Sequence, residues 1–190
     1  MMVSTDDLKP GDGLLVVDVQ NDFCPGGALA IPHGDQVVPV LNTWLAAAGA
    51  RDLPVYASRD WHPRRHPSFR DQGGEWPPHC LQDTDGAAFH FGLQLPADTV
   101  VVTKGVRFDK DQYSAFHETG LLAQLQRDGV RRLFVGGLAQ DVCVRDTVLA
   151  AREAGLDVVL LQTATRPVDE DEGRRVLDDM GNAGAVMVSG

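Results

Sequence analysis

Short aliphatic runs recur along the chain and alternate with amphipathic stretches. Runs typical of strands buried on both faces lie at residues 14–19, 54–58, 99–103, 132–136, 157–161 and 185–188. Apolar residues follow helical spacing at 37–50, 141–154 and 169–181. The alternation predicts an α/β fold with right-handed crossovers: a three-layer αβα sandwich whose six-stranded, mostly parallel sheet has helices on both faces.

The segment at about 59–96 breaks this regularity. It contains His62, His66, His79 and His90 together with several prolines, and it shows little periodicity. Loops of this length in compact domains are usually functional or disordered, and the aromatic residues and histidines of this one favour function. We therefore expect a single domain over residues 1–190 that carries a metal- and substrate-binding loop at about 59–96.

Three chemically reactive side chains fall at the ends of predicted strands. Asp18 and Lys104 each end an aliphatic run, and Cys143 follows a strand and the Gly136–Gly137 turn. Ligand and reaction sites of parallel sheets lie at this edge, and an acid, a base and a thiol together favour a nucleophilic site. Asp141 is the expected N-cap of the next helix and Gly155 lies past its expected end. The N-terminus of that helix is expected to lower the pKa of the Cys143 thiol.

Carboxylate and imidazole groups cluster in the irregular loop. Asp60 and His62 are two residues apart and point the same way if the segment is extended, and His66 and His79 follow. These are ligand types of Zn, Mn or Fe sites, which predicts one divalent metal ion. The spacing alone leaves a structural and a catalytic metal equally open.

Composition narrows the class of partner. The 190 residues include 17 Lys and Arg against 27 Asp and Glu, a net charge of −10, which argues against nucleic acid and anionic membranes as partners. The odd number of cysteines, Cys24, Cys80 and Cys143, argues against a closed disulfide framework. Neither a secretory pattern nor a long apolar run is seen, so a cytoplasmic location is expected.

Seven segments, taken in order, resemble a known family. They are DVQNDFCPGG at 18–27, RDWHP at 59–63, HPSF at 66–69, WPPHC at 76–80, KG at 104–105, YSAF at 113–116 and GLAQDVCV at 137–144. The chain from Leu14 to Val188 is similar to the nicotinamidases of the isochorismatase-like cysteine hydrolase superfamily. Seven ordered matches are far more specific than any one of them.

The resemblance implies roles for individual residues. It implies a catalytic triad of Asp18, Lys104 and Cys143. It implies a metal, zinc before manganese or iron, on Asp60, His62 and His79, with His66 as a variable fourth ligand. It places Phe23, Trp76 and Tyr113 around a pyridine ring. It also implies a cis peptide between Leu138 and Ala139, with the backbone N–H groups of Ala139 and Cys143 forming the oxyanion hole.

The activity implied is hydrolysis of nicotinamide, a small neutral aromatic amide, to nicotinic acid and ammonia through a thioester on Cys143. Asp18 would act as general base and then acid, Lys104 would stabilise charge, and the metal would hold the pyridine nitrogen. The chain departs from the family pattern at Gln112, Gln140 and Val142, which bears on the shape of the pocket.

Other functions share part of this residue set. A cysteine amidase of the same superfamily acting on a carbamoyl or ureido compound would keep the triad but has no evident use for the metal ligands. A zinc hydrolase using metal-bound water would leave Cys143 structural. A non-enzymatic metal-binding module would need no convergence of polar groups at the strand ends. The oligomeric state is left open.

Overall fold

The computed structural model describes residues 4–189 and contains one six-stranded sheet. The strands are Asp12–Val17 (β1), Val55–Asp60 (β2), Val100–Lys104 (β3), Arg132–Leu138 (β4), Asp157–Arg166 (β5) and Val186–Val188 (β6). Their order is β3-β2-β1-β4-β5-β6, and every neighbouring pair is parallel. The α/β prediction is confirmed, and the sheet is parallel throughout rather than mostly parallel. In the register between β2 and β3, Asp60 is paired with Lys104.

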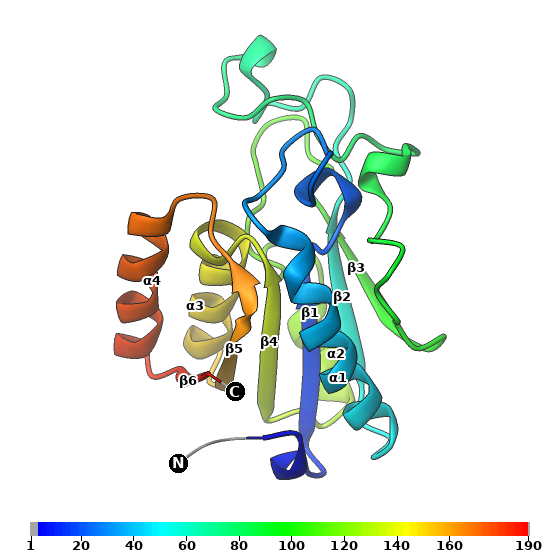
Figure 1. Cartoon of the computed structure of the whole chain (residues 1–190), viewed down its shortest axis with the longest axis vertical. Coiled ribbons are helices and arrows are strands. Elements are labelled where there is room, and N and C mark those ends of the chain that lie inside the picture. Colours follow the sequence, from blue (N-terminus) through cyan, green and yellow to red (C-terminus); the bar gives the residue numbers. More distant parts are fainter. Residues whose placement is uncertain (1–3, 190) are drawn as a thin grey trace.

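Helices cover both faces of this sheet (Figure 1). Helix α1 (Val37–Gly49) lies on one face, and the other face carries α2 (Leu121–Arg127), α3 (Arg145–Glu153) and α4 (Glu170–Asn182). Strand β1 shows why both faces need cover: Leu14 and Val16 pack on the α1 side, whereas Leu15 and Val17 pack on the opposite side. A strand with no polar face is stable only between two helical layers.

The helix after β4 begins differently from expectation. Gln140–Val144 forms a π-helical turn before α3, and its N-cap residue Ala139 offers no capping side chain. The prediction that Asp141 is the N-cap is therefore wrong. The Asp141 carboxylate instead accepts the backbone N–H groups of Val168 and Asp169, at 2.9 Å each, on the loop between β5 and α4. Gly155 does lie just past the end of α3, at φ 85°.

Helix α2 was not anticipated from the sequence. It is 7 residues long and begins after Gly120, which has a φ of 78°. Only Leu121 and Leu125 are buried on it, so the apolar pattern spans a single turn. A pattern this short is too weak to separate a helix from a loop.

The irregular segment folds back over the carboxyl edge of the sheet. His62 bridges to Leu81 and Phe69 to Trp76 within the segment, and Phe89 bridges to Gln20 after β1. The Gln20 side chain donates to the backbone oxygens of Asp60 and Ala87, at 2.7 and 2.8 Å. These contacts fix the loop against the strand ends. Among residues 4–189, the helices are all too short or too polar to cross a bilayer.

Candidate active site

Asp18, Lys104 and Cys143 meet at the carboxyl edge of the sheet. Asp18 directly follows β1, Lys104 ends β3, and Cys143 lies in the π-helical turn after β4. The Nζ atom of Lys104 is 2.7 Å from Oδ2 of Asp18 and 3.4 Å from Sγ of Cys143. All three side chains are buried. The acid, lysine and thiol expected to share this edge are thus in contact.

The Asp18 carboxyl group is held in a dry environment. Its residue has a φ of 48°, and the Ser58 hydroxyl donates to its Oδ1 at 2.7 Å. Burial raises the pKa of Asp18, and this outweighs the lowering by Lys104 and Ser58. A carboxyl group with a raised pKa is suited to accept a proton and to return it.

The surroundings of the Cys143 thiol favour its protonated form. Burial raises its pKa well above the usual value, and the attraction of Lys104 only partly opposes this. The expected lowering of this pKa by the helix N-terminus is therefore wrong, because desolvation of the sulfur is the larger effect. Ligand atoms of Asp18, Asp60 and Cys143 lie within 4.8 Å of one another, so a base is close enough to take the proton.

A second group of side chains lies beside this one. Ligand atoms of Asp60, His62 and His79 are within 4.8 Å of one another. The Nδ1 atom of His62 is 2.8 Å from the Gly105 carbonyl oxygen, and that of His79 is 2.7 Å from the carbonyl oxygen of Pro77. A carbonyl oxygen only accepts, so each Nδ1 carries a proton, and in the neutral ring the lone pair is then on Nε2. This arrangement, with backbone carbonyls orienting the rings, is typical of metal-binding histidines.

His66 adds a third imidazole next to His62 and His79. Its ring is tilted against that of His62, with 4.1 Å between the centroids, and its Nδ1 is 2.7 Å from the hydroxyl oxygen of Ser68. Its Nε2 is buried and lacks a hydrogen-bond partner among the described residues. Burial and the neighbouring His62 lower the pKa of His66 to about 4, which favours the neutral ring. A buried, unpartnered imidazole nitrogen fits a metal cation better than a structural role.

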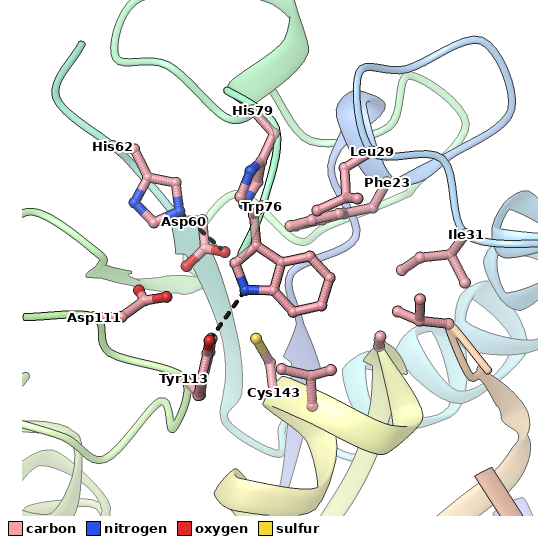
Figure 2. Close-up of a pocket in the computed structure, with 13 residues that line it drawn as sticks. Phe23, Leu29, Ile31, Asp60, His62, Trp76, His79, Asp111, Tyr113 and Cys143 are labelled. Carbon is pink, nitrogen blue, oxygen red and sulfur yellow. Dashed lines mark hydrogen bonds and ion pairs between the residues drawn. The ribbon is translucent and has the colours of Figure 1, made fainter. Parts of the chain in front are cut away.

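The pocket in front of these groups has mainly apolar walls (Figure 2). Of the residues expected around a ring, Phe23, Trp76 and Tyr113 all line it, and Trp76 Nε1 donates to the Tyr113 hydroxyl at 3.0 Å. The wall residues that the sequence did not reveal are Leu29, Ile31, Asp111 and Val168. The aliphatic ones come from irregular segments, where periodicity gives no signal. Asp111 lies two residues before Tyr113, and in the sequence only its carboxylate could have indicated a role in the pocket.

Depth separates the predicted residues. Asp60, His62, His79 and Cys143 reach the pocket surface, whereas Asp18, Lys104 and His66 are fully buried and do not line it. The empty space is about 380 Å³, including the open mouth. The thiol and the imidazole group therefore line one cavity.

The three departures from the family pattern have different consequences. Only Val142 lines the pocket. The Gln112 side chain accepts from the Gly105 N–H at 3.1 Å and donates to the His117 carbonyl at 2.6 Å, so it holds its own loop together. The Gln140 side chain bonds Thr165 and Gly173, at 2.8 Å each, and thereby ties the turn that carries Cys143 to β5 and α4.

The backbone at the turn also has the implied form. The peptide bond between Leu138 and Ala139 is cis. It lies directly before the π-helical turn, so the N–H groups of Ala139 and Cys143 belong to one short segment beside the thiol.

Comparisons with known proteins identify the family of the chain. Residues 12–190 match the isochorismatase domain. The chain is similar to a nicotinamidase of Escherichia coli, at 37% identity over 94% of this chain and 94% of that protein.

Solved structures of relatives are similar to the chain over most of its length. A pyrazinamidase of Pyrococcus horikoshii in complex with zinc has a TM-score of 0.92 and 40% identity, and it covers 95% of this chain and 100% of that one. PnC1 from L. infantum in complex with nicotinate has a TM-score of 0.88 and 37% identity, covering 100% and 96%.

Proposed function

The chain belongs to the isochorismatase family as an amidohydrolase, and we propose that it hydrolyses nicotinamide to nicotinic acid and ammonia. One observation carries this proposal: the Cys143 thiol and the Asp60, His62 and His79 group line the same apolar pocket. A substrate for this site has a small flat ring with a metal-binding nitrogen at one end and a carbonyl carbon at the other. Nicotinamide has this shape, and the names of the relatives support the choice.

The first half-reaction forms an acyl-enzyme. Asp18 accepts the proton of the Cys143 thiol, and the Lys104 ammonium stabilises the negative charge beside both groups. The thiolate attacks the carboxamide carbon and forms a C–S bond. The backbone N–H groups of Ala139 and Cys143 stabilise the oxyanion. Asp18 then protonates the amide nitrogen, the C–N bond breaks, and ammonia leaves with the thioester in place.

The second half-reaction uses water. Asp18, again ionised, takes a proton from a water molecule whose oxygen attacks the thioester carbon. The C–S bond breaks, the proton returns to the Cys143 sulfur, and nicotinic acid is released. One water is consumed and the enzyme returns to its starting state, so a single carboxyl group with a raised pKa serves both halves.

Four side chains would hold the metal: Asp60, His62, His79 and, from behind, His66. Imidazole and carboxylate donors suit zinc first and manganese or iron next. When bound, the metal supplies a Lewis-acid contact for the ring nitrogen. The flat walls of Phe23, Trp76 and Tyr113 orient the ring so that the carboxamide points to Cys143. We also propose that the chain forms one hydrolase domain, since β1 and β6 belong to one sheet.

The decisive experiment measures ammonia and nicotinic acid released from nicotinamide by the zinc-loaded protein. Cys143→Ala is expected to lower kcat by at least about a thousandfold, because it removes the nucleophile. Cys24→Ala is the matched control and keeps full activity, since Cys24 is a buried thiol outside this pocket. Hydrolysis that survives in Cys143→Ala, or after complete alkylation of Cys143, would instead support a metal-water hydrolase. Activity confined to ureido compounds would support the carbamoyl amidase.

A further inference from the structure

Asp111 places a second carboxylate at the edge of the candidate metal site. Its side chain lines the pocket on the side of His62 (Figure 2). A carboxylate oxygen of Asp111 and ring nitrogens of His62 and His66 lie within 4.8 Å of one another. His62 is therefore shared between this trio and the Asp60, His62 and His79 group.

The Asp111 carboxylate has no cationic partner in residues 4–189. Its Oδ1 accepts only the N–H of the next residue, Gln112, at 2.8 Å. The basic residues of the same loop pair with other carboxylates. Arg107 pairs with Asp109 and Glu118, and Lys110 pairs with Glu118 at 2.8 Å. The loop thus neutralises its other acids and leaves Asp111 facing the imidazoles.

His66 provides an independent observation on the same spot. Its side chain is fully buried, and its Nε2 is a polar atom without a protein partner in the described part of the chain. One ring nitrogen of the same imidazole belongs to the trio with Asp111. A carboxylate without a cation and a buried nitrogen without a donor are both satisfied if a positive ion lies between them.

The charges around the candidate metal site also favour a role for Asp111. In the buried interior, the carboxylates of Asp18 and Asp60 face the ammonium of Lys104, which contacts both. A divalent cation on Asp60, His62 and His79 then leaves one positive charge uncompensated beside the pocket. The carboxylate of Asp111 compensates it.

We propose that Asp111 is a carboxylate of the metal centre, and that with His66 it sets how tightly the chain holds the divalent cation. Asp60 is weakened as an anionic ligand because its Oδ1 is 2.6 Å from Lys104 Nζ. Asp111 supplies the charge that Lys104 withdraws from Asp60. This inference rests on the proposed metal site and not on the identity of the amide.

The test measures zinc affinity of the metal-free protein by competition with a chromophoric chelator. Asp111→Asn keeps the shape of the side chain and removes its charge, and we expect an affinity loss of about 10–100-fold. Asp109→Asn, on the same loop but paired with Arg107, is the matched control and is expected to stay within about twofold of the wild type. Asp111→Glu restores the charge and should recover part of the affinity.

Metal-free thermal unfolding of the wild type and Asp111→Asn shows whether the fold is intact, and equal transitions are expected. A zinc affinity of Asp111→Asn within about twofold of the wild type would overturn the proposal, as would an equal loss in Asp109→Asn. The outcome is separate from the proposed reaction. A protein whose zinc affinity depends on Asp111 but that leaves nicotinamide intact keeps this inference and loses the nicotinamidase proposal.

Discussion

Oδ1 of Asp60 lies 2.6 Å from Nζ of Lys104, so a carboxylate of the candidate metal site is also an ion-pair partner of the candidate triad. The same ammonium is 2.7 Å from Oδ2 of Asp18. One buried cation therefore joins the group that would bind the ring of the substrate to the group that would break its amide bond.

Replacing Lys104 with methionine is expected to lower the free energy of unfolding by about 3–5 kcal/mol, because two buried carboxylates lose their cation. Equilibrium denaturation in urea measures this. Lys110→Met is the control: Lys110 pairs with Glu118 on the surface, and its loss should cost less than about 1 kcal/mol. Equal stabilities of the two variants would contradict the central place given to Lys104.

The hydrogen bond from Ser58 to Asp18 predicts a pH effect. Ser58 stabilises the ionised carboxylate and so lowers the pKa of Asp18, against the larger raising effect of burial. In Ser58→Ala that pKa rises further. Since Asp18 must be ionised to take the thiol proton, the acid limb of kcat/KM moves to higher pH.

Rate measurements across the pH range on Ser58→Ala and Ser58→Thr test this shift. Threonine keeps a hydroxyl that can donate to Oδ1, and its acid limb should stay with that of the wild type. An unmoved limb in the alanine variant would show that Asp18 does not govern the profile.

Asp141 is expected to control substrate affinity through the pocket wall. Its carboxylate accepts the N–H groups of Val168 and Asp169, and Val168 lines the pocket. In Asp141→Ala we expect KM for nicotinamide to rise several-fold and the free energy of unfolding to fall by about 1.5–3 kcal/mol.

Steady-state kinetics and denaturation check both effects. Asp171→Ala serves as the control, because its side chain pairs with Arg174 on the surface of α4. If Asp141→Ala and this control have the same KM, the loop between β5 and α4 does not need Asp141 for its position, and the prediction is wrong.

Gly86 marks a tight contact behind the metal loop. A Cβ atom there would collide with Oδ2 of Asp22, the oxygen that accepts the Cys80 N–H next to His79. Gly86→Ala is expected to destabilise the fold by about 1–3 kcal/mol and to weaken zinc binding. Gly49→Ala, with nothing within 4 Å of its Cβ in α1, should be neutral or stabilising. Unfolding curves of the two variants that coincide would refute the contact.

The convergence of Asp18, Lys104 and Cys143 could be predicted because it needs only one rule, that parallel strands end on a common edge. Strand positions could be predicted from aliphatic runs because a strand that is buried on both faces consists almost entirely of apolar residues. The contact between Lys104 and Asp60 required more, namely the order of β1, β2 and β3, which no local pattern encodes.

Sequence reasoning failed where tertiary contacts outweigh local preference. Asp141 has the composition of an N-cap, yet a loop 27 residues further on provides its partners. The thiol of Cys143 follows burial rather than its position near a helix start. Val168 and Ile31 enter the pocket from irregular segments, so only the folded chain reveals them. The metal-site and triad roles were anticipated through resemblance, and they stay predictions until the variants above are measured.

The register that pairs Asp60 with Lys104 has a consequence for engineering by recombination. Adding or deleting one residue inside β2 or β3 would turn the affected side chain to the other face of the sheet and separate the two charges. A chimera that moves this site into another scaffold should therefore take β2 and β3 from the same parent protein. Length changes belong in the connection around Phe91, whose side chain is 92% exposed.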